Sequence, residues 1–144
     1  MHNFYVFIHN AFTVILKAEH IRDNNIMKTT FHTVNDERIL ELEDEGYILK
    51  DAQDLLDIIG SYPVRTIILR KENIIPDFFD LKTKVAGEIL QKASNYGLKI
   101  GIIGDFKSIK SKSLRDFIYE SNKTKQIIFK ESKEEILKIF GKER

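Results

Sequence analysis

The sequence predicts a single layered α/β domain, with a mixed, mostly parallel sheet of about five strands and with four helices. Three observations predict it. β-prone runs alternate with helical patterns from Met27 onward, the 144 residues suit one domain, and no repeat, low-complexity tract or linker divides the chain. Because strands separated by helices join through right-handed crossovers, most strands should run parallel.

The first elements are a hairpin and a helix. Residues 29–34 and 38–42 are β-prone and are joined by a turn at 35–37, which predicts an antiparallel edge to the sheet. Asp51 is a good N-cap for a helix with apolar residues at helical spacing, and Gly60 should end that helix.

The later elements alternate strictly. The apolar runs 64–69, 98–103 and 126–129 have the length of buried strands. Three helices should accompany them: a long one near 79–96, one that starts at the capping-box sequence Ser113-Leu-Arg-Asp116, and a last one capped by Ser132.

Residues 1–26 read differently from the rest. Residues 4–16 are aromatic and apolar but too short for a bilayer span, which needs roughly 20 apolar residues. Met27 opens a run that looks like a natural start. We therefore expect 1–26 to be an N-terminal extension, from a mis-assigned start or a docking segment, and 27–144 to be the domain. No secretory signal pattern is present, so we expect a cytoplasmic protein.

Cysteine and histidine usage restricts the chemistry. The chain has no cysteine, which excludes disulfides and thiolate sites. All four histidines (His2, His9, His20 and His32) precede Thr33. Histidine is the commonest general base and metal ligand near neutral pH. We therefore expect a core without imidazole, a site built from carboxylates, lysine, tyrosine or hydroxyls, and no cofactor.

Three segments carry more specific residue choices than packing requires: 77–91 with Asn95-Tyr-Gly97, then 101–106, then 112–120. They resemble small bacterial proteins of the domain-of-unknown-function 4180 family, and the likeness extends over roughly 48–140. This resemblance implies a protein of uncharacterised function, without an established activity.

The order of elements is also similar to the STAS fold of anti-sigma-factor antagonists and transporter tails. That likeness implies a non-enzymatic regulatory domain, with a phosphorylatable Ser or Thr at one helix start. Thr83 lies nearest that place and is the candidate phosphorylation site. The usual Asp-Ser-Ser-Gly run is absent, since the chain reads Asp80-Leu-Lys-Thr83.

Six residues are candidate binding residues: Asp80, Thr83, Gly87, Glu88, Asp105 and Tyr119. Asp80 and Thr83 should lie at a helix N-terminus, where free N–H groups attract anions, although either could simply cap the helix. Asp105 should lie at the carboxyl edge of a strand, where α/β sheets place ligands. The alternative for Asp105 is a turn aspartate that bonds its own loop.

The other three candidates are less specific. Glycine in the middle of a helix costs about 1 kcal/mol relative to alanine, so Gly87 should either admit a neighbouring strand or present a flat surface to a partner. Glu88 lies on the polar stripe of the same helix. Tyr119 should line a pocket near Asp105, the alternative being a half-buried tyrosine.

Three functions stay open. The first is a regulatory module that works by protein contact or small-ligand binding. The second is a small carboxylate- or magnesium-dependent enzyme with Asp80, Asp105 and Glu88 at the strand ends. The third is a homodimer whose seam is the apolar N-terminal segment. The net charge of +1 gives no reason to expect a nucleic-acid partner, and no membrane partner is expected.

Overall fold

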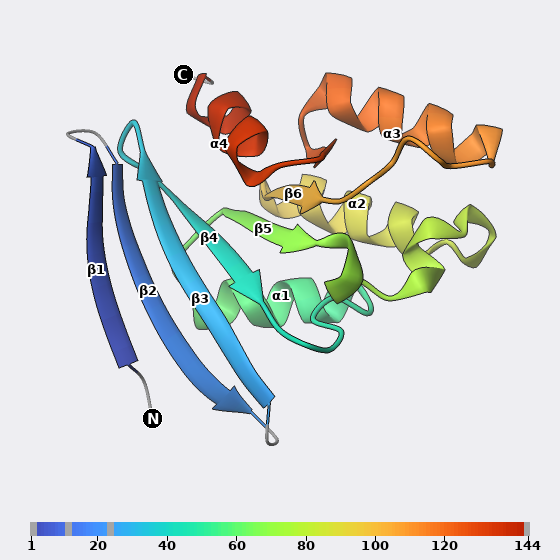
Figure 1. The fold of residues 1–144 in the computed structure, drawn as a ribbon. Coiled ribbons are helices and arrows are strands. Elements are labelled where there is room, and N and C mark those ends of the chain that lie inside the picture. The colour runs from blue at the N-terminus through green and yellow to red at the C-terminus, as the bar shows by residue number, and fades with distance from the viewer. Residues whose placement is uncertain (1–2, 11–12, 23–24, 143–144) are drawn as a thin grey trace.

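The computed structural model describes the backbone of residues 3–10, 13–22 and 25–142, and the side chains of residues 27–141. The described residues form a seven-stranded sheet and four α-helices (Figure 1). The strands are β1 (Asn3–Asn10), β2 (Thr13–Arg22), β3 (Asn25–Val34), β4 (Glu37–Glu43), β5 (Thr66–Arg70), β6 (Lys99–Ile103) and β7 (Ile127–Lys130). The helices are α1 (Ala52–Ser61), α2 (Val85–Tyr96), α3 (Lys112–Thr124) and α4 (Lys133–Lys142).

The strands lie in the sheet in the order in which they follow along the chain. β1 to β4 pair antiparallel, and β4 to β7 pair parallel. The expected α/β class, mixed sheet and four helices are confirmed, and the five expected strands correspond to β3–β7. β1 and β2 extend the sheet beyond them, and the expected boundary at Met27 falls inside β3. That residues 1–26 are an extension stays a prediction.

The expected hairpin is β3–β4. Its turn consists of Asn35 and Asp36, whose φ angles of 52° and 66° are those of the primed turns that join tightly paired strands. This turn fixes the register, in which Thr30 lies opposite Glu41 and His32 lies opposite Ile39. Side chains alternate between faces along a strand, so residues 32 and 41 share one face of the sheet as diagonal neighbours.

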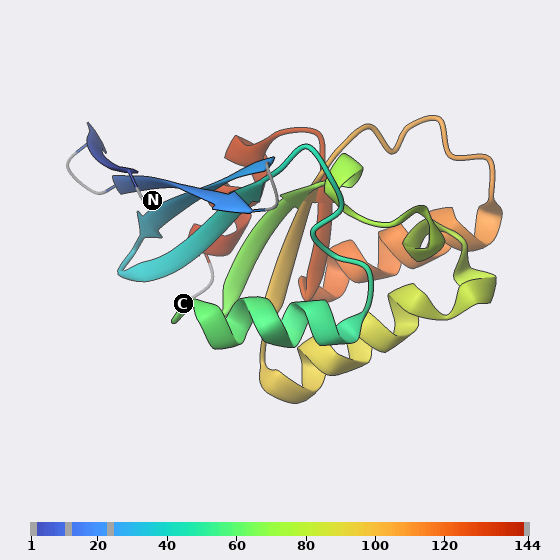
Figure 2. The same ribbon diagram turned by 90° about the horizontal axis from the view of Figure 1, so that it is seen from below.

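The two faces of the sheet are covered by different helices. The main core packs strand residues such as Leu40, Ile67 and Ile100 against α1 and α2, with α3 beside them (Figure 2). The alternate strand residues form a second core with α4 on the other face: Ile39, Ile68 and Ile128 with Ile136 and Phe140. No described helix is long and apolar enough to cross a bilayer.

The start of α2 differs from the expectation. Two 3₁₀ turns, η2 (Pro76–Phe79) and η3 (Leu81–Thr83), precede it, and Lys84 has a left-handed φ of 69°. A left-handed residue cannot continue a right-handed helix, so α2 begins at Val85 rather than at Phe79.

The caps of the last two helices agree only in part with the expectation. The hydroxyl of Ser111, not that of Ser113, accepts the Leu114 N–H at 3.2 Å and caps α3. Ser132 caps α4 as expected, because its hydroxyl accepts the Glu135 N–H at 3.3 Å.

Candidate functional site

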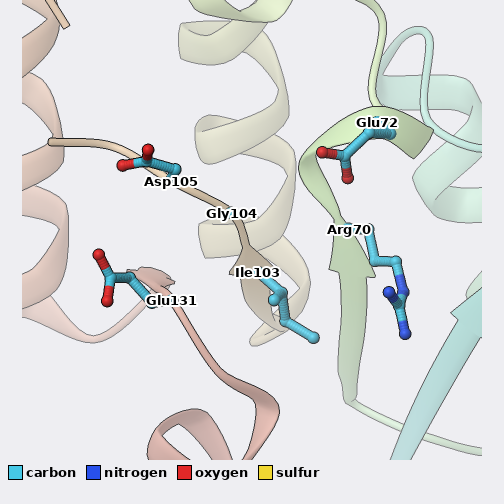
Figure 3. A pocket seen from close by; sticks show the side chains of 6 residues that line it. All are labelled: Arg70, Glu72, Ile103, Gly104, Asp105 and Glu131. Atoms are coloured by element: carbon cyan, nitrogen blue, oxygen red, sulfur yellow. The ribbon is translucent and has the colours of Figure 1, made fainter. Parts of the chain in front are cut away.

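The parallel strands end at one edge of the sheet, where Arg70, Ile103 and Lys130 lie side by side in register. Two hollows lie at this edge. The first, here called the acidic hollow, has a volume of about 360 Å³ and is lined by Arg70, Glu72, Ile103, Gly104, Asp105 and Glu131. In Figure 3, Asp105 and Glu131 lie on one side of the end of β6, and Glu72 and Arg70 on the other.

Negative charge predominates in the acidic hollow. The Arg70 guanidinium pairs with Glu43 at 3.2 Å and points away from the Glu72 carboxylate (Figure 3). Lys107 pairs with Glu131 at 3.0 Å, and this hydrogen bond raises the pKa of Lys107 above its ordinary 10.5. Glu72 has no hydrogen-bond or ion-pair partner among the described side chains.

The second hollow, here called the apolar hollow, has a volume of about 520 Å³. It is lined by Tyr47, Lys71, Glu72, Ile74, Pro76 and Phe79, so Glu72 lines both hollows. Tyr47 is 51% exposed. The Lys71 ammonium lies 5.6 Å from the centroids of both the Phe79 and the Phe106 rings.

A glycine at the end of β6 allows Lys71 to take this position. A Cβ on Gly104 would lie 2.8 Å from Lys71 Cβ, closer than side-chain carbons approach one another. The lysine stem therefore passes directly over the backbone at Gly104. Its ammonium then donates to the Asp105 carbonyl oxygen at 3.4 Å.

Asn73 fixes the loop that carries Tyr47. This residue ends the short turn η1 (Lys71–Asn73) and is only 2% exposed. Its side-chain amide nitrogen donates to the carbonyl oxygens of Asp44 (2.7 Å) and Gly46 (2.9 Å), and its backbone carbonyl oxygen accepts the N–H groups of Ile48 (2.7 Å) and Leu49 (3.1 Å). Four hydrogen bonds thus join the two walls of the apolar hollow, as in a preformed ligand site.

A buried charged cluster lies on the α4 face of the sheet. His32 is 2% exposed, and its Nε2 lies 2.8 Å from Glu41 Oε1, while the Lys133 ammonium approaches the same oxygen at 3.4 Å. Burial is the largest influence on the pKa of Glu41 and raises it. The hydrogen bond from His32 and the positive charge of Lys133 outweigh it, and the pKa falls from 4.5 to about 2.

The expectation of a core without imidazole is therefore wrong. Residue 32 belongs to β3, and the antiparallel pairing with β4 places it inside the sheet rather than in a separate N-terminal segment. The carboxylate that His32 contacts is that of Glu41. The candidate carboxylates Asp80 and Asp105 lie elsewhere, in exposed turns. No group of three metal-ligand side chains occurs in the described part of the chain.

The chain was compared with known proteins. A family model described as "Domain of unknown function (DUF4180)" matches residues 34–139. The chain belongs to the DUF4180 family. The matched part contains both hollows and Glu41, whereas His32 and all of β1 and β2 precede it. No match was found among curated proteins or among solved structures.

In this DUF4180 protein Asp80 and Thr83 hold their own turns. Asp80 accepts the Lys82 N–H at 3.2 Å. The Thr83 hydroxyl lies 2.5 Å from the carbonyl oxygen of Asp77 and 2.8 Å from that of Asp80, and it accepts the Val85 N–H at 3.3 Å. Asp80 therefore caps the short turn η3, and α2 itself, whose N-cap residue is Lys84, has no side-chain cap; neither Asp80 nor Thr83 lines either hollow.

Asp105 is the candidate that lies at the expected edge. It follows β6 and lines the acidic hollow, and its carboxylate also accepts the Lys107 N–H at 3.0 Å. The two interpretations of this residue are therefore compatible: it stabilises its own loop and faces a hollow at the ends of the strands.

Gly87, Glu88 and Tyr119 lie elsewhere on the DUF4180 domain. Gly87 is exposed and a Cβ on it would meet no atom within 4 Å, so the idea that it admits a strand is wrong, while the surface interpretation stays a prediction. Glu88 is exposed on the same helix. Tyr119 is 62% exposed and does not line the hollow that contains Asp105, so that expectation is wrong, because Phe117 and Ile118 take the inward positions of α3.

Sequence reasoning missed most of the lining residues. Glu72 and Glu131 each follow a strand that the sequence predicts, so the strand-end argument that found Asp105 could also have found them. Tyr47 and Asn73 had no comparable signal, because their positions depend on hydrogen bonds between a loop and a distant turn.

Proposed function

We propose that this DUF4180 protein is a non-enzymatic, STAS-like regulatory domain of the cytoplasm that holds a small ligand at the carboxyl edge of β5–β7. A partner protein would recognise the ligand-bound domain by contact with this edge. The STAS-like order of elements supports the regulatory part of the proposal, and the geometry of the edge supports the ligand-binding part.

One observation carries the proposal most strongly. Two hollows meet at Glu72, at the edge where α/β sheets bind ligands, and the wall that carries Tyr47 is held in place by Asn73. A rigid concave surface with an apolar wall and a few charged groups is typical of small-molecule sites.

A thermal-shift screen against a metabolite panel tests this proposal. A ligand that binds only the folded protein raises the melting temperature in proportion to its occupancy. We expect Tyr47→Ser to abolish the shift and Tyr119→Ser, the matched change of an exposed tyrosine outside both hollows, to retain it. The reverse pattern would contradict the proposal and favour the surface of α3.

The carboxylate- or metal-dependent enzyme is the alternative for the same edge. Asp105 favours it, because this carboxylate lines the acidic hollow at the end of a strand. It predicts that Mg²⁺ or Mn²⁺ raises the melting temperature and that Asp105→Asn removes the effect. The absence of a shift with either ion would rule out the metal-dependent form.

Self-association is the third candidate function. β1 is the outermost strand on its side of the sheet, and its eight residues include no proline and no Asp, Glu, Lys or Arg. Natural sheets usually protect such an edge, and an identical copy can pair with it antiparallel. Light scattering should show a dimer for the full chain and a monomer for Val6→Lys. A monomeric full chain would contradict self-association.

A further inference from the structure

We propose that the apolar hollow binds a free α-amino acid with an apolar side chain. This inference rests on the proposed function, because it names a ligand class for the same edge. It is motivated by the presence of one cationic side chain, Lys71, and one anionic side chain, Glu72, on an otherwise apolar surface.

The apolar part of the hollow suits a hydrocarbon or aromatic side chain. Tyr47 and Phe79 present rings, and Ile74 and Pro76 complete the wall. The volume of about 520 Å³ lies within the usual range of small-ligand sites. A polar side chain placed here would lose hydration without gaining hydrogen bonds, so the wall should discriminate against hydrophilic amino acids.

The charged part of the hollow is zwitterionic. Lys71 and Glu72 are adjacent in the chain, both line the hollow, and neither forms an ion pair with another described side chain. Glu72 can accept from an α-ammonium group, and Lys71 can donate to an α-carboxylate. Charge-assisted hydrogen bonds of this kind are the strong ones in ligand recognition.

Ligands with one charge fit less well. A carboxylate without an ammonium group would meet the unpaired charge of Glu72, with Asp105 and Glu131 close by in the acidic hollow. An amine without a carboxylate would meet Lys71 and would leave the lysine charge uncompensated. Complementary charges discriminate between such partners through the repulsion of the wrong ones.

Isothermal titration calorimetry on the full chain tests the proposal with a matched set of probes. L-phenylalanine carries both charges, phenethylamine lacks the carboxylate, 3-phenylpropionate lacks the ammonium group, and L-serine lacks the apolar side chain. We expect L-phenylalanine to bind about tenfold or more tightly than each of the other three, since each loses one charged or apolar contact.

Two variants connect this preference to the two charges. Glu72→Gln should weaken L-phenylalanine binding about tenfold and should strengthen 3-phenylpropionate binding, because it removes the negative charge that repels a lone carboxylate. Lys71→Met keeps the stem that crosses Gly104 and removes the charge, so it should weaken L-phenylalanine binding and strengthen phenethylamine binding, which the lysine charge opposes. Glu120→Gln removes an exposed carboxylate of α3 that lines neither hollow; it is the control and should change nothing.

Amide chemical shifts recorded in the same titrations separate the possible failures. Larger chemical-shift changes at Tyr47, Glu72 and Phe79 with L-phenylalanine than with the analogues support the inference. Equal binding of an analogue, or perturbation of these residues only by other metabolites, overturns the amino-acid proposal and leaves the ligand-binding edge standing. If neither the probes nor the metabolite panel perturbs these residues, both proposals fall.

Discussion

His32 Nε2 lies 2.8 Å from Glu41 Oε1, with both side chains almost fully buried. An ionised carboxylate only accepts hydrogen bonds, so Nε2 carries the proton. The ammonium of Lys133 in α4 forms an ion pair with the same oxygen. The cluster therefore connects β3, β4 and the helix that covers this face. His32 Nδ1 and Glu41 Oε2 have no partner among the described side chains.

Removing one member of this pair should be costly. His32→Leu leaves the Glu41 carboxylate buried without its principal donor, and breaking a buried pair in this way typically costs about 3–5 kcal/mol. The double variant His32→Leu/Glu41→Met removes both polar groups and should recover part of that loss. Urea unfolding measures both. A loss below about 1 kcal/mol for the single variant would contradict a structural role for the pair.

The pair should also make stability depend on acid pH. The folded pKa of Glu41 is lowered from 4.5 to about 2, so its contribution is complete above pH 4.5 and disappears as the pH falls toward 2. A shift of this size corresponds to about 3 kcal/mol. Unfolding free energies measured through this interval should fall less steeply for Glu41→Gln, and parallel curves would contradict the assignment.

Two glycines should respond to alanine with opposite signs. Gly87 is exposed in α2 with open space around it, so Gly87→Ala should stabilise the protein by about 1 kcal/mol. A Cβ on Gly101 would lie 2.5 Å from Ile136 Cγ2, so Gly101→Ala should destabilise by about 1–3 kcal/mol by pushing α4 from the sheet. Chemical denaturation compares the two, and a destabilising Gly87→Ala would refute the open-surface interpretation.

The Thr83 hydroxyl should stabilise the turn that precedes α2. Thr83→Val keeps the shape and loses the hydrogen bonds to the preceding turn and to Val85, at a cost of about 1 kcal/mol. Thr83→Ser keeps the hydroxyl and should stay close to the parent protein in a thermal melt. Phosphorylation at Thr83 stays a prediction, and intact mass of protein purified from cells would detect it.

The side-chain hydrogen bonds from Asn73 to Asp44 and Gly46, here called the Asn73 clamp, should be sensitive to replacement of one nitrogen atom by oxygen. Asn73→Asp replaces the amide donor with an acceptor that faces the carbonyl oxygens of Asp44 and Gly46, while the shape is kept. Loss of these bonds and the resulting repulsion should destabilise the fold by about 3 kcal/mol. Asn73→Ala should cost less. Equal melting temperatures for Asn73→Asp and the parent would contradict the role of the clamp.

The sequence was sufficient for much of the fold. The turn residues Asn35 and Asp36 predicted the hairpin, and alternating apolar strands and helices predicted the parallel part. The start of α2 was missed because residues 79–84 carry helix-compatible residue types, whereas the left-handed Lys84 is visible only in three dimensions. Propensity is a weak guide where tertiary contacts set the backbone.

The candidate site was predictable only in part. The position of Asp105 at the carboxyl edge was predicted correctly, because it follows from strand direction alone. Pairing of His32 with Glu41 also follows from the two-residue turn, once the hairpin register is counted from Asn35 and Asp36. The apolar hollow needs the clamp between Asn73 and the loop around Tyr47, 26 residues earlier in the chain, and no local pattern encodes that contact.

A crystal structure of the full chain, purified from its native cells without stripping, would show directly whether the carboxyl edge of β5–β7 holds a ligand. We expect additional electron density in the apolar hollow, in contact with Glu72 and with the rings of Tyr47 and Phe79. Density bound on another surface, such as beside Tyr119 on α3, with only solvent at the carboxyl edge, would contradict this expectation.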